Sequence, residues 1–177
     1  MSAQELVVLG RVFKIASSLF LGCVIFAASG ARAEDPDFVT LVGGYFDFNR
    51  QKDKGFEGRL EYRFSDRYFI FKPFLTAAYT NTKMGFFGAG VLVDIYLGRR
   101  FVVIPSFAPT FYFGGNDKLD LGHPIEFRSQ LELAYRFDNR SRLGFAVSHY
   151  SNASLGDSNP GTETLSLNYS IPVNIFK

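Results

Sequence analysis

Three residues whose side chains can cooperate in ester hydrolysis lie near the C-terminal end of the sequence. His149 and Ser151 are two residues apart, and Glu163 follows in the same stretch, SHYSNASLGDSNPGTETLSL. A serine nucleophile, an imidazole that removes its proton and a carboxylate that orients the imidazole are the parts of a serine hydrolase site. Single serines and glutamates are also common in polar hairpin loops, and the spacing alone does not separate these two interpretations. The decision depends on the elements that position the three side chains.

Apolar and polar residues alternate through most of the sequence, with the period of a β-strand rather than that of a helix. The clearest runs are FEGRLEYRF at 56–64 and IEFRSQLELAYRF at 125–137, in which the polar positions carry mainly Glu and Arg. Each run is long enough for a tilted strand to cross a bilayer, which takes about 9–11 residues. Further runs lie near 38–47, 69–79, 85–97, 101–113, 142–151 and 162–176, so the sequence predicts about eight strands.

The connections between these runs differ in length. Short polar turns are expected at 65–67, 98–100 and 138–141, and mostly longer loops at 49–55, 80–83, 114–124 and 152–160. Outer-membrane barrels have short periplasmic turns and longer extracellular loops. We therefore predict an all-β fold, an eight-stranded antiparallel transmembrane β-barrel too narrow for a pore. The alternative is a soluble, lipocalin-like barrel, whose apolar face would point inward.

The N-terminal segment has the composition of a secretory signal peptide. Arg11 and Lys14 precede the apolar run IASSLFLGCVIFAA, and SGARAE follows with an A-x-A-like cleavage site. We predict a signal peptide over residues 1–33 and the barrel over 34–177. The single cysteine, Cys23, falls in the predicted signal, so we expect no disulfide in the mature chain.

Charge and residue spacing argue against several other classes of function. Without residues 1–33 the acidic and basic residues balance, which gives no electrostatic basis for binding nucleic acid. His123 has no acid or thiol at a ligand spacing, and GGNDKLD lacks the pattern of a calcium loop. FFGAG at 86–90 lacks the strand–helix context of a dinucleotide-binding fingerprint, so we expect neither a metal nor a cofactor.

The phase of the strands places the three hydrolase-type residues on one surface. His149 and Ser151 continue the apolar row of Leu143 and Val147, and Glu163 precedes the apolar row that begins at Leu165. All three should therefore face the lipid at the outer end of one hairpin. A carboxylate and an imidazole are costly there unless they pair, and neighbouring strands of a hairpin allow them to pair.

This stretch resembles the signature of the lipid A 3-O-deacylases, the PagL family of outer-membrane enzymes. The resemblance implies Ser151 as nucleophile, His149 as general base and Glu163 as its orienter. It also implies Asn152 as an oxyanion-hole contributor through its side chain or backbone, and Asn159 as a supporting residue of the site. The matched positions are His149, Ser151, Asn152, Ala153, Asn159, Pro160, Gly161, Thr162 and Glu163.

The resemblance further implies the substrate and the location. The expected reaction is hydrolysis of the 3-hydroxyacyl ester at the 3 position of lipid A, in the outer membrane of a Gram-negative bacterium, with the site near the outer leaflet. The expected partners are lipopolysaccharide and outer-membrane lipid, and a homodimer is left open. The alternatives are a non-enzymatic small outer-membrane barrel and an outer-membrane phospholipase.

Overall fold

The computed structural model describes residues 35–173, which form β-strands and no helix. Residues 1–33, and with them the predicted signal peptide, lie outside the described residues, so that boundary stays a prediction. No helix in the described part of the chain could cross a membrane. The strands are β1 (Asp37–Phe46), β2 (Gly55–Arg63), β3 (Lys72–Thr80), β4 (Met84–Leu92), β5 (Ile95–Leu97), β6 (Phe101–Gly114), β7 (Ile125–Arg136), β8 (Arg142–Ser151) and β9 (Thr162–Val173).

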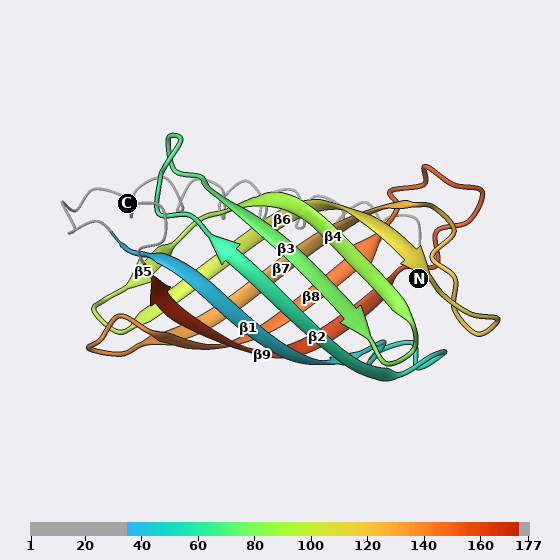
Figure 1. The fold of residues 1–177 in the computed structure, drawn as a ribbon, viewed down its shortest axis with the longest axis horizontal. Helices are drawn as coiled ribbons and strands as arrows, with labels where there is room; N and C mark the ends of the chain where they lie inside the picture. Colours follow the sequence, from blue (N-terminus) through green and yellow to red (C-terminus); the bar gives the residue numbers. More distant parts are fainter. Residues whose placement is uncertain (1–34, 174–177) are drawn as a thin grey trace, which may run out of the picture. The chain divides into compact units, whose positions relative to one another are not determined.

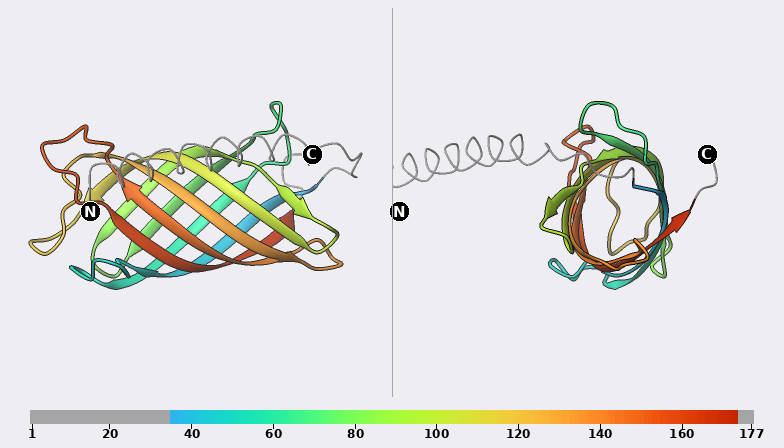
Figure 2. Two further views of the ribbon diagram at one scale, coloured as in Figure 1. Left: turned by 180° about the vertical axis from the view of Figure 1, so that it is seen from behind. Right: turned by 90° about the vertical axis from the view of Figure 1, so that its left-hand side faces the viewer.

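These strands close into a single antiparallel barrel (Figures 1 and 2). Neighbours in sequence pair with one another except β4 and β5, β1 pairs with β9, and β4 pairs with β6, which closes the sheet. β4 and β5 are two parts of one strand, because Leu92 opposite Ser106 and Ile95 opposite Val103 have the same register on β6. Between them Val93 faces Pro105, which has no N–H to donate to the ladder. With β4 and β5 counted as one strand, the barrel thus has eight strands, as predicted.

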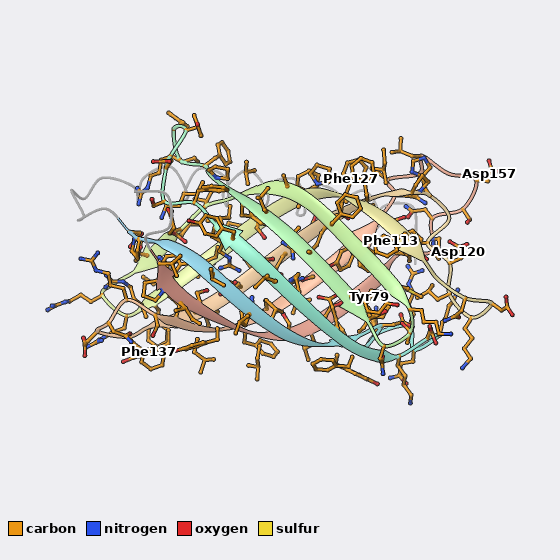
Figure 3. All side chains as sticks on the ribbon, in the orientation of Figure 1. Tyr79, Phe113, Asp120, Phe127, Phe137 and Asp157 are labelled. Carbon is orange, nitrogen blue, oxygen red and sulfur yellow. The ribbon has the colours of Figure 1, made fainter. Side chains whose placement is uncertain are left out.

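The outward face of the barrel is apolar. Side chains such as Leu131, Phe145 and Leu167 are about half exposed, while the alternate residues on the same strands are buried inside. Figure 3 shows the outer side chains standing around the wall, Phe113 and Phe127 among them. This is the pattern of a barrel in lipid, and it is opposite to that of the soluble alternative.

The interior contains a network of paired charges beside buried apolar clusters, one of which includes Phe74 and Ile104. Arg63 lies 2.8 Å from Glu132 on the opposite wall and 2.8 Å from Glu61. Arg128 lies 2.6 Å from Glu61, and Arg59 lies 3.2 Å from the same carboxylate. All five side chains are almost fully buried. These five charged side chains therefore neutralise one another inside the barrel, where an unpaired charge would be costly.

The end of the barrel that carries the long loops is closed by an apolar cluster. Leu119 and Leu121 of the β6–β7 loop are buried against Phe86, Tyr112 and Tyr150 inside the barrel. The β6–β7 and β8–β9 loops project from this end, where Figure 3 labels Asp120 and Asp157. Because long loops are extracellular in outer-membrane barrels, we call this the outer end.

The opposite end is closed by a buried ionic cluster. Lys72 lies 3.1 Å from Asp35 and 2.6 Å from Asp94, and Arg142 lies 2.8 Å from Asp94. Tyr96 donates a hydrogen bond to Asp35. Burial raises the pKa of Asp35, but Lys72, the Tyr96 hydroxyl and Arg142 together more than offset burial, so that pKa lies below its usual value. These residues join the start of β1 to β3, β5 and β8.

The connection between β2 and β3 differs from the prediction of a tight turn at 65–67. β2 ends at Arg63 and β3 begins at Lys72, and the residues between them project from the barrel (Figure 1). Tyr68 and Phe71 exchange two backbone hydrogen bonds, 2.9 and 3.1 Å long, around Phe69, whose φ is 65°. The apolar run at 69–71 had suggested the start of a strand, but its residues form this small separate turn instead.

Candidate active site

His149 and Glu163 form a pair on the outward wall of the barrel near its outer end. The two residues are directly opposite each other on β8 and β9, and Nδ1 of His149 lies 3.1 Å from Oε1 of Glu163. The imidazole is 45% exposed and the carboxylate 16%. The pair therefore has one partner sheltered in the wall and one accessible from outside. This is the orientation in which a carboxylate fixes a working imidazole.

The pairing through Nδ1 leaves Nε2 as the nitrogen that can act on another group. If Nδ1 carries the proton that the carboxylate accepts, Nε2 is unprotonated and can serve as a base. The space beside Nε2 depends on Gly161, whose φ is +61°. A Cβ on Gly161 would lie 3.2 Å from Cε1 and 3.7 Å from Nε2 of His149. A side chain at this position would crowd the reactive edge of the ring.

Ser151 is the last residue of β8 and lies on the same outward face as His149. It is half-buried and sits opposite Phe127 of β7. Residues i and i+2 of a strand are about 7 Å apart along the backbone. Within residues 35–173, no hydrogen bond joins Ser151 to His149. The structure thus forms the His149–Glu163 pair and places the serine next to it without a direct bond.

Asn152 is completely buried, and its polar groups are engaged by the surrounding loops. Its Nδ2 donates to the carbonyls of Leu121 at 2.9 Å and Ser158 at 2.7 Å, and its backbone N–H donates to Oδ1 of Asn159 at 3.1 Å. Its Oδ1 accepts the Ser154 N–H at 2.9 Å. Asn152 and Asn159 therefore fix the chain directly after Ser151. The oxyanion role that the resemblance implies for Asn152 would require one of these donors to change partner, and it stays a prediction.

The β6–β7 loop contacts the β8–β9 loop and supports it. Besides the carbonyl of Leu121, Gly122 contributes by its conformation and its lack of a side chain: its φ is +82°, and a Cβ there would lie 2.7 Å from Oγ of Ser158. Gly156 in turn lies close to the carbonyl group of Gly122. A Cβ added at Gly156 would lie 2.7 Å from that carbonyl oxygen. Sequence reasoning did not find this contact, because nothing in the spacing of the two loops indicates that they touch.

Sequence reasoning also missed Ser129, which lies directly opposite His149 on β7. Its side chain is exposed on the outer wall, between the outward positions of Phe127 and Leu131. A signal was present in the sequence, since Ser129 is the polar interruption of an otherwise apolar row in IEFRSQLELAYRF. The position of Ser129 beside His149 becomes apparent only from the register of β7 and β8.

The remaining histidine has a local structural role. Nδ1 of His123 accepts the backbone N–H of Ile125 at 3.0 Å, at the start of β7. Within the described residues, no three His, Cys, Asp or Glu side chains gather in a group that could hold a metal ion.

Comparison with known proteins agrees with this architecture. No curated protein sequence matches the chain. Among solved structures, the crystal structure of the outer membrane enzyme PagL is 19% identical, with a TM-score of 0.62, and the match covers 77% of this chain and 99% of that one. Neisserial surface protein A is 11% identical, with a TM-score of 0.56 over 77% of this chain and 96% of the other. At these identities the likeness establishes the barrel fold.

The family itself is established by sequence. The model of the family described as "Lipid A 3-O-deacylase (PagL)" matches residues 40–172, which include every strand residue from β1 to β9 that forms the site. Lipid A is anchored in the outer membrane of Gram-negative bacteria, and the apolar outer wall fits that location. The chain therefore belongs to the PagL family of lipid A 3-O-deacylases, hydrolases of the outer membrane.

Proposed function

We propose that the protein removes the ester-linked 3-hydroxyacyl chain from the 3 position of lipid A, with Ser151 as nucleophile, His149 as general base and Glu163 as orienter. The observation that carries the proposal is the His149–Glu163 pair, with its 3.1 Å contact, on the lipid-facing wall near the outer end. An isolated imidazole and carboxylate would be costly at this position. Their pairing beside a serine suits a reaction at the level where acyl chains meet the sugar headgroup.

The chemistry proceeds in two halves. Oγ of Ser151 attacks the ester carbonyl carbon while Nε2 of His149 takes the hydroxyl proton. The tetrahedral intermediate then expels the sugar 3-oxygen, which receives that proton, and an acyl-serine remains. Water attacks the acyl-serine with His149 again as base, and Ser151 leaves with the proton as a free 3-hydroxy fatty acid is released. Glu163 holds the ring and stabilises the imidazolium in both halves.

The first half requires Ser151 and His149 to come within hydrogen-bond reach of each other. Apo geometries are often looser than those of substrate complexes, so the absence of a direct bond is compatible with this role. Rotation of the Ser151 side chain about its Cα–Cβ bond is the smallest change that could bring Oγ toward Nε2. The hydrogen bonds of Asn152 with Asn159 and Leu121 restrict movement of the backbone after Ser151, so we propose that the side chain rotates instead.

The test is to express the full-length protein in a Gram-negative host and to weigh its lipid A by mass spectrometry beside a Ser151→Ala variant. Loss of one 3-hydroxyacyl chain with the parent, and not with the variant, is the expected result. Equal loss with both would mean that Ser151 is not the nucleophile. Unchanged lipid A with both, when heat-modifiable gel mobility shows folded barrels, would reject the deacylase reaction and favour a phospholipase or a non-enzymatic barrel.

A further inference from the structure

The outward rows of the eight long strands carry very few polar side chains. Nearly all the outward positions are glycine, alanine, proline, aliphatic or aromatic, and Asp37, which lies at the opposite end of the barrel, accepts a hydrogen bond from the Tyr62 hydroxyl. Four other positions in the described strands depart from this rule. They are Ser129, His149, Ser151 and Glu163.

These four residues are also neighbours in space. Ser129 lies opposite His149 across β7 and β8, and His149 lies opposite Glu163 across β8 and β9. Directly opposed residues have their Cβ atoms about 4.5–5.5 Å apart. Three of the four form the proposed catalytic group, and the fourth, Ser129, lies opposite its histidine on the neighbouring strand.

Ser129 is a small, exposed residue between the larger Phe107 and His149 on the neighbouring strands, and we call this position the notch. On the far side from His149 its neighbour is Phe107 of β6, whose ring stacks on Phe127 with centroids 5.8 Å apart and planes at 12°. Farther from the outer end, the row continues with Leu131, which faces Val147 of β8. A serine at 129 occupies less space between Phe107 and His149 than a leucine would, and the outward row leads from it to the apolar side chains of Leu131 and Val147.

We infer that Ser129 is a specificity-determining residue: its small side chain leaves the space through which the acyl end of the ester reaches His149 and Ser151. The acyl chain then lies over Leu131 and Val147, toward the middle of the membrane. A leucine at 129, like those at 131 and 133, would fill this space. The inference rests on the proposed function and adds to it the route by which a long-chain ester enters the site.

The experiment uses the full mature protein, purified in detergent, with three variants. Ser129→Leu fills the notch, and Ser129→Ala keeps it open while removing the hydroxyl. Ala77→Leu is the matched control, because Ala77 is an exposed small residue on the outward face of β3. With β4 and β5 counted as one strand, β3 lies four strands from β8 in either direction around the barrel. The substrates are lipid A, p-nitrophenyl laurate as a long-chain ester and p-nitrophenyl acetate as an ester whose acyl group does not need the notch. A small fluorophosphonate reports on the reactivity of the nucleophile.

Steric exclusion in an apolar site changes kcat/KM by roughly 10- to 200-fold, and we expect a loss in this range for Ser129→Leu with lipid A and the laurate ester. Acetate hydrolysis and fluorophosphonate labelling should stay within about threefold of the parent, as should all readouts of Ser129→Ala and Ala77→Leu. Parental activity of Ser129→Leu on long esters would overturn the inference. So would an equal loss in Ser129→Ala, which would assign the effect to the hydroxyl.

The same measurements separate this inference from the proposed function. A parent that hydrolyses the laurate ester but leaves lipid A unchanged would reject the deacylase reaction, while the ratio of laurate to acetate activity in Ser129→Leu would still judge the notch. A Ser129→Leu variant that loses acetate hydrolysis and fluorophosphonate labelling as well would show a disturbed catalytic group and would reject a purely steric role. A parent inactive on all three esters would reject both.

Discussion

Glu163 directs one carboxylate oxygen toward His149, and its other carboxylate oxygen is buried. Oε1 lies 3.1 Å from Nδ1 of His149, whereas Oε2 is buried and has no hydrogen-bond partner in the described part of the protein. The orientation of the carboxylate is therefore set by the imidazole and by the strand that carries it. The contact between Nδ1 of His149 and Oε1 of Glu163 joins β8 to β9 on the outer face.

We expect Glu163→Gln to lower kcat strongly while the barrel stays folded. The amide cannot stabilise the imidazolium and can hold the ring in the wrong tautomer, a change that costs on the order of 10⁴-fold in a serine protease triad. Lipid A mass spectrometry and hydrolysis of p-nitrophenyl esters measure the loss, and gel mobility before and after heating checks the fold. A variant with parental kcat would remove Glu163 from the catalytic group.

Asn152→Ala should release the chain that follows Ser151. The substitution removes the donors to the carbonyls of Leu121 and Ser158 and leaves both oxygens without that partner. Each lost buried hydrogen bond costs about 1–3 kcal/mol. We expect faster proteolytic cleavage within residues 152–161 together with a lower kcat. If kcat falls while the cleavage rate stays parental, an oxyanion role for Asn152 is favoured over an anchoring one.

Gly122→Ala tests the contact between the β6–β7 loop and the β8–β9 loop. The new Cβ would be strained by a φ of +82° and would lie 2.7 Å from Oγ of Ser158, so the β8–β9 loop must shift. Gly98→Ala is the matched control, because its φ is +70° but an added Cβ meets nothing within 4 Å. We expect esterase activity to fall in Gly122→Ala and to remain in Gly98→Ala. Equal activity in both would show that the loop contact does not position the site.

Arg63→Met should destabilise the barrel by about 3–5 kcal/mol, because Glu61 and Glu132 would lose a buried partner. Arg100→Met removes an ion pair to Asp138 that is 2.6 Å long but exposed to solvent, so the substitution should change the stability of the barrel very little. Urea unfolding of the two variants in detergent micelles, followed by tyrosine fluorescence, compares them. A similar loss in both would mean that burial does not decide the strength of these pairs.

Asp35 should contribute a stability that disappears in acid. Its pKa is lowered from 3.8 in the folded protein, so its ionised form is the one that folding favours. The contribution is present above the pKa of the unfolded chain and is lost as pH falls through the lower folded value. The difference in unfolding temperature between the parent and Asp35→Asn should therefore be largest near neutral pH and shrink below about pH 4. A difference independent of pH would contradict this.

The alternation of the sequence was enough to predict the barrel and the outward phase of His149, Ser151 and Glu163. A period of two fixes which residues share a face, and it places these three residues in the apolar rows. The lengths of the connections favoured a membrane barrel, in which those rows face outward. The same reasoning failed between β2 and β3, where the apolar residues Phe69 and Phe71 form a separate turn. Period cannot distinguish a strand from a protruding hairpin this short.

Contacts between strands and loops were beyond the reach of the sequence. The opposition of Ser129 and His149 depends on the register of β7 and β8, and the bond from Asn152 to Leu121 depends on how two loops fold over the end of the barrel. Neither follows from spacing along the chain. Ser129 was visible as an interruption, but its neighbour was not.

The outward position of His149 and Glu163 also determines how substrate and enzyme meet. A lipid approaches this wall by lateral diffusion within its leaflet, so the rate depends on molecules per unit of membrane area rather than on a bulk concentration. The cleaved glycolipid and the released fatty acid are both amphiphiles and stay in the same plane, where they can return to the wall they have left. Turnover at such a site is thus governed by the changing composition of the surrounding membrane as the reaction proceeds.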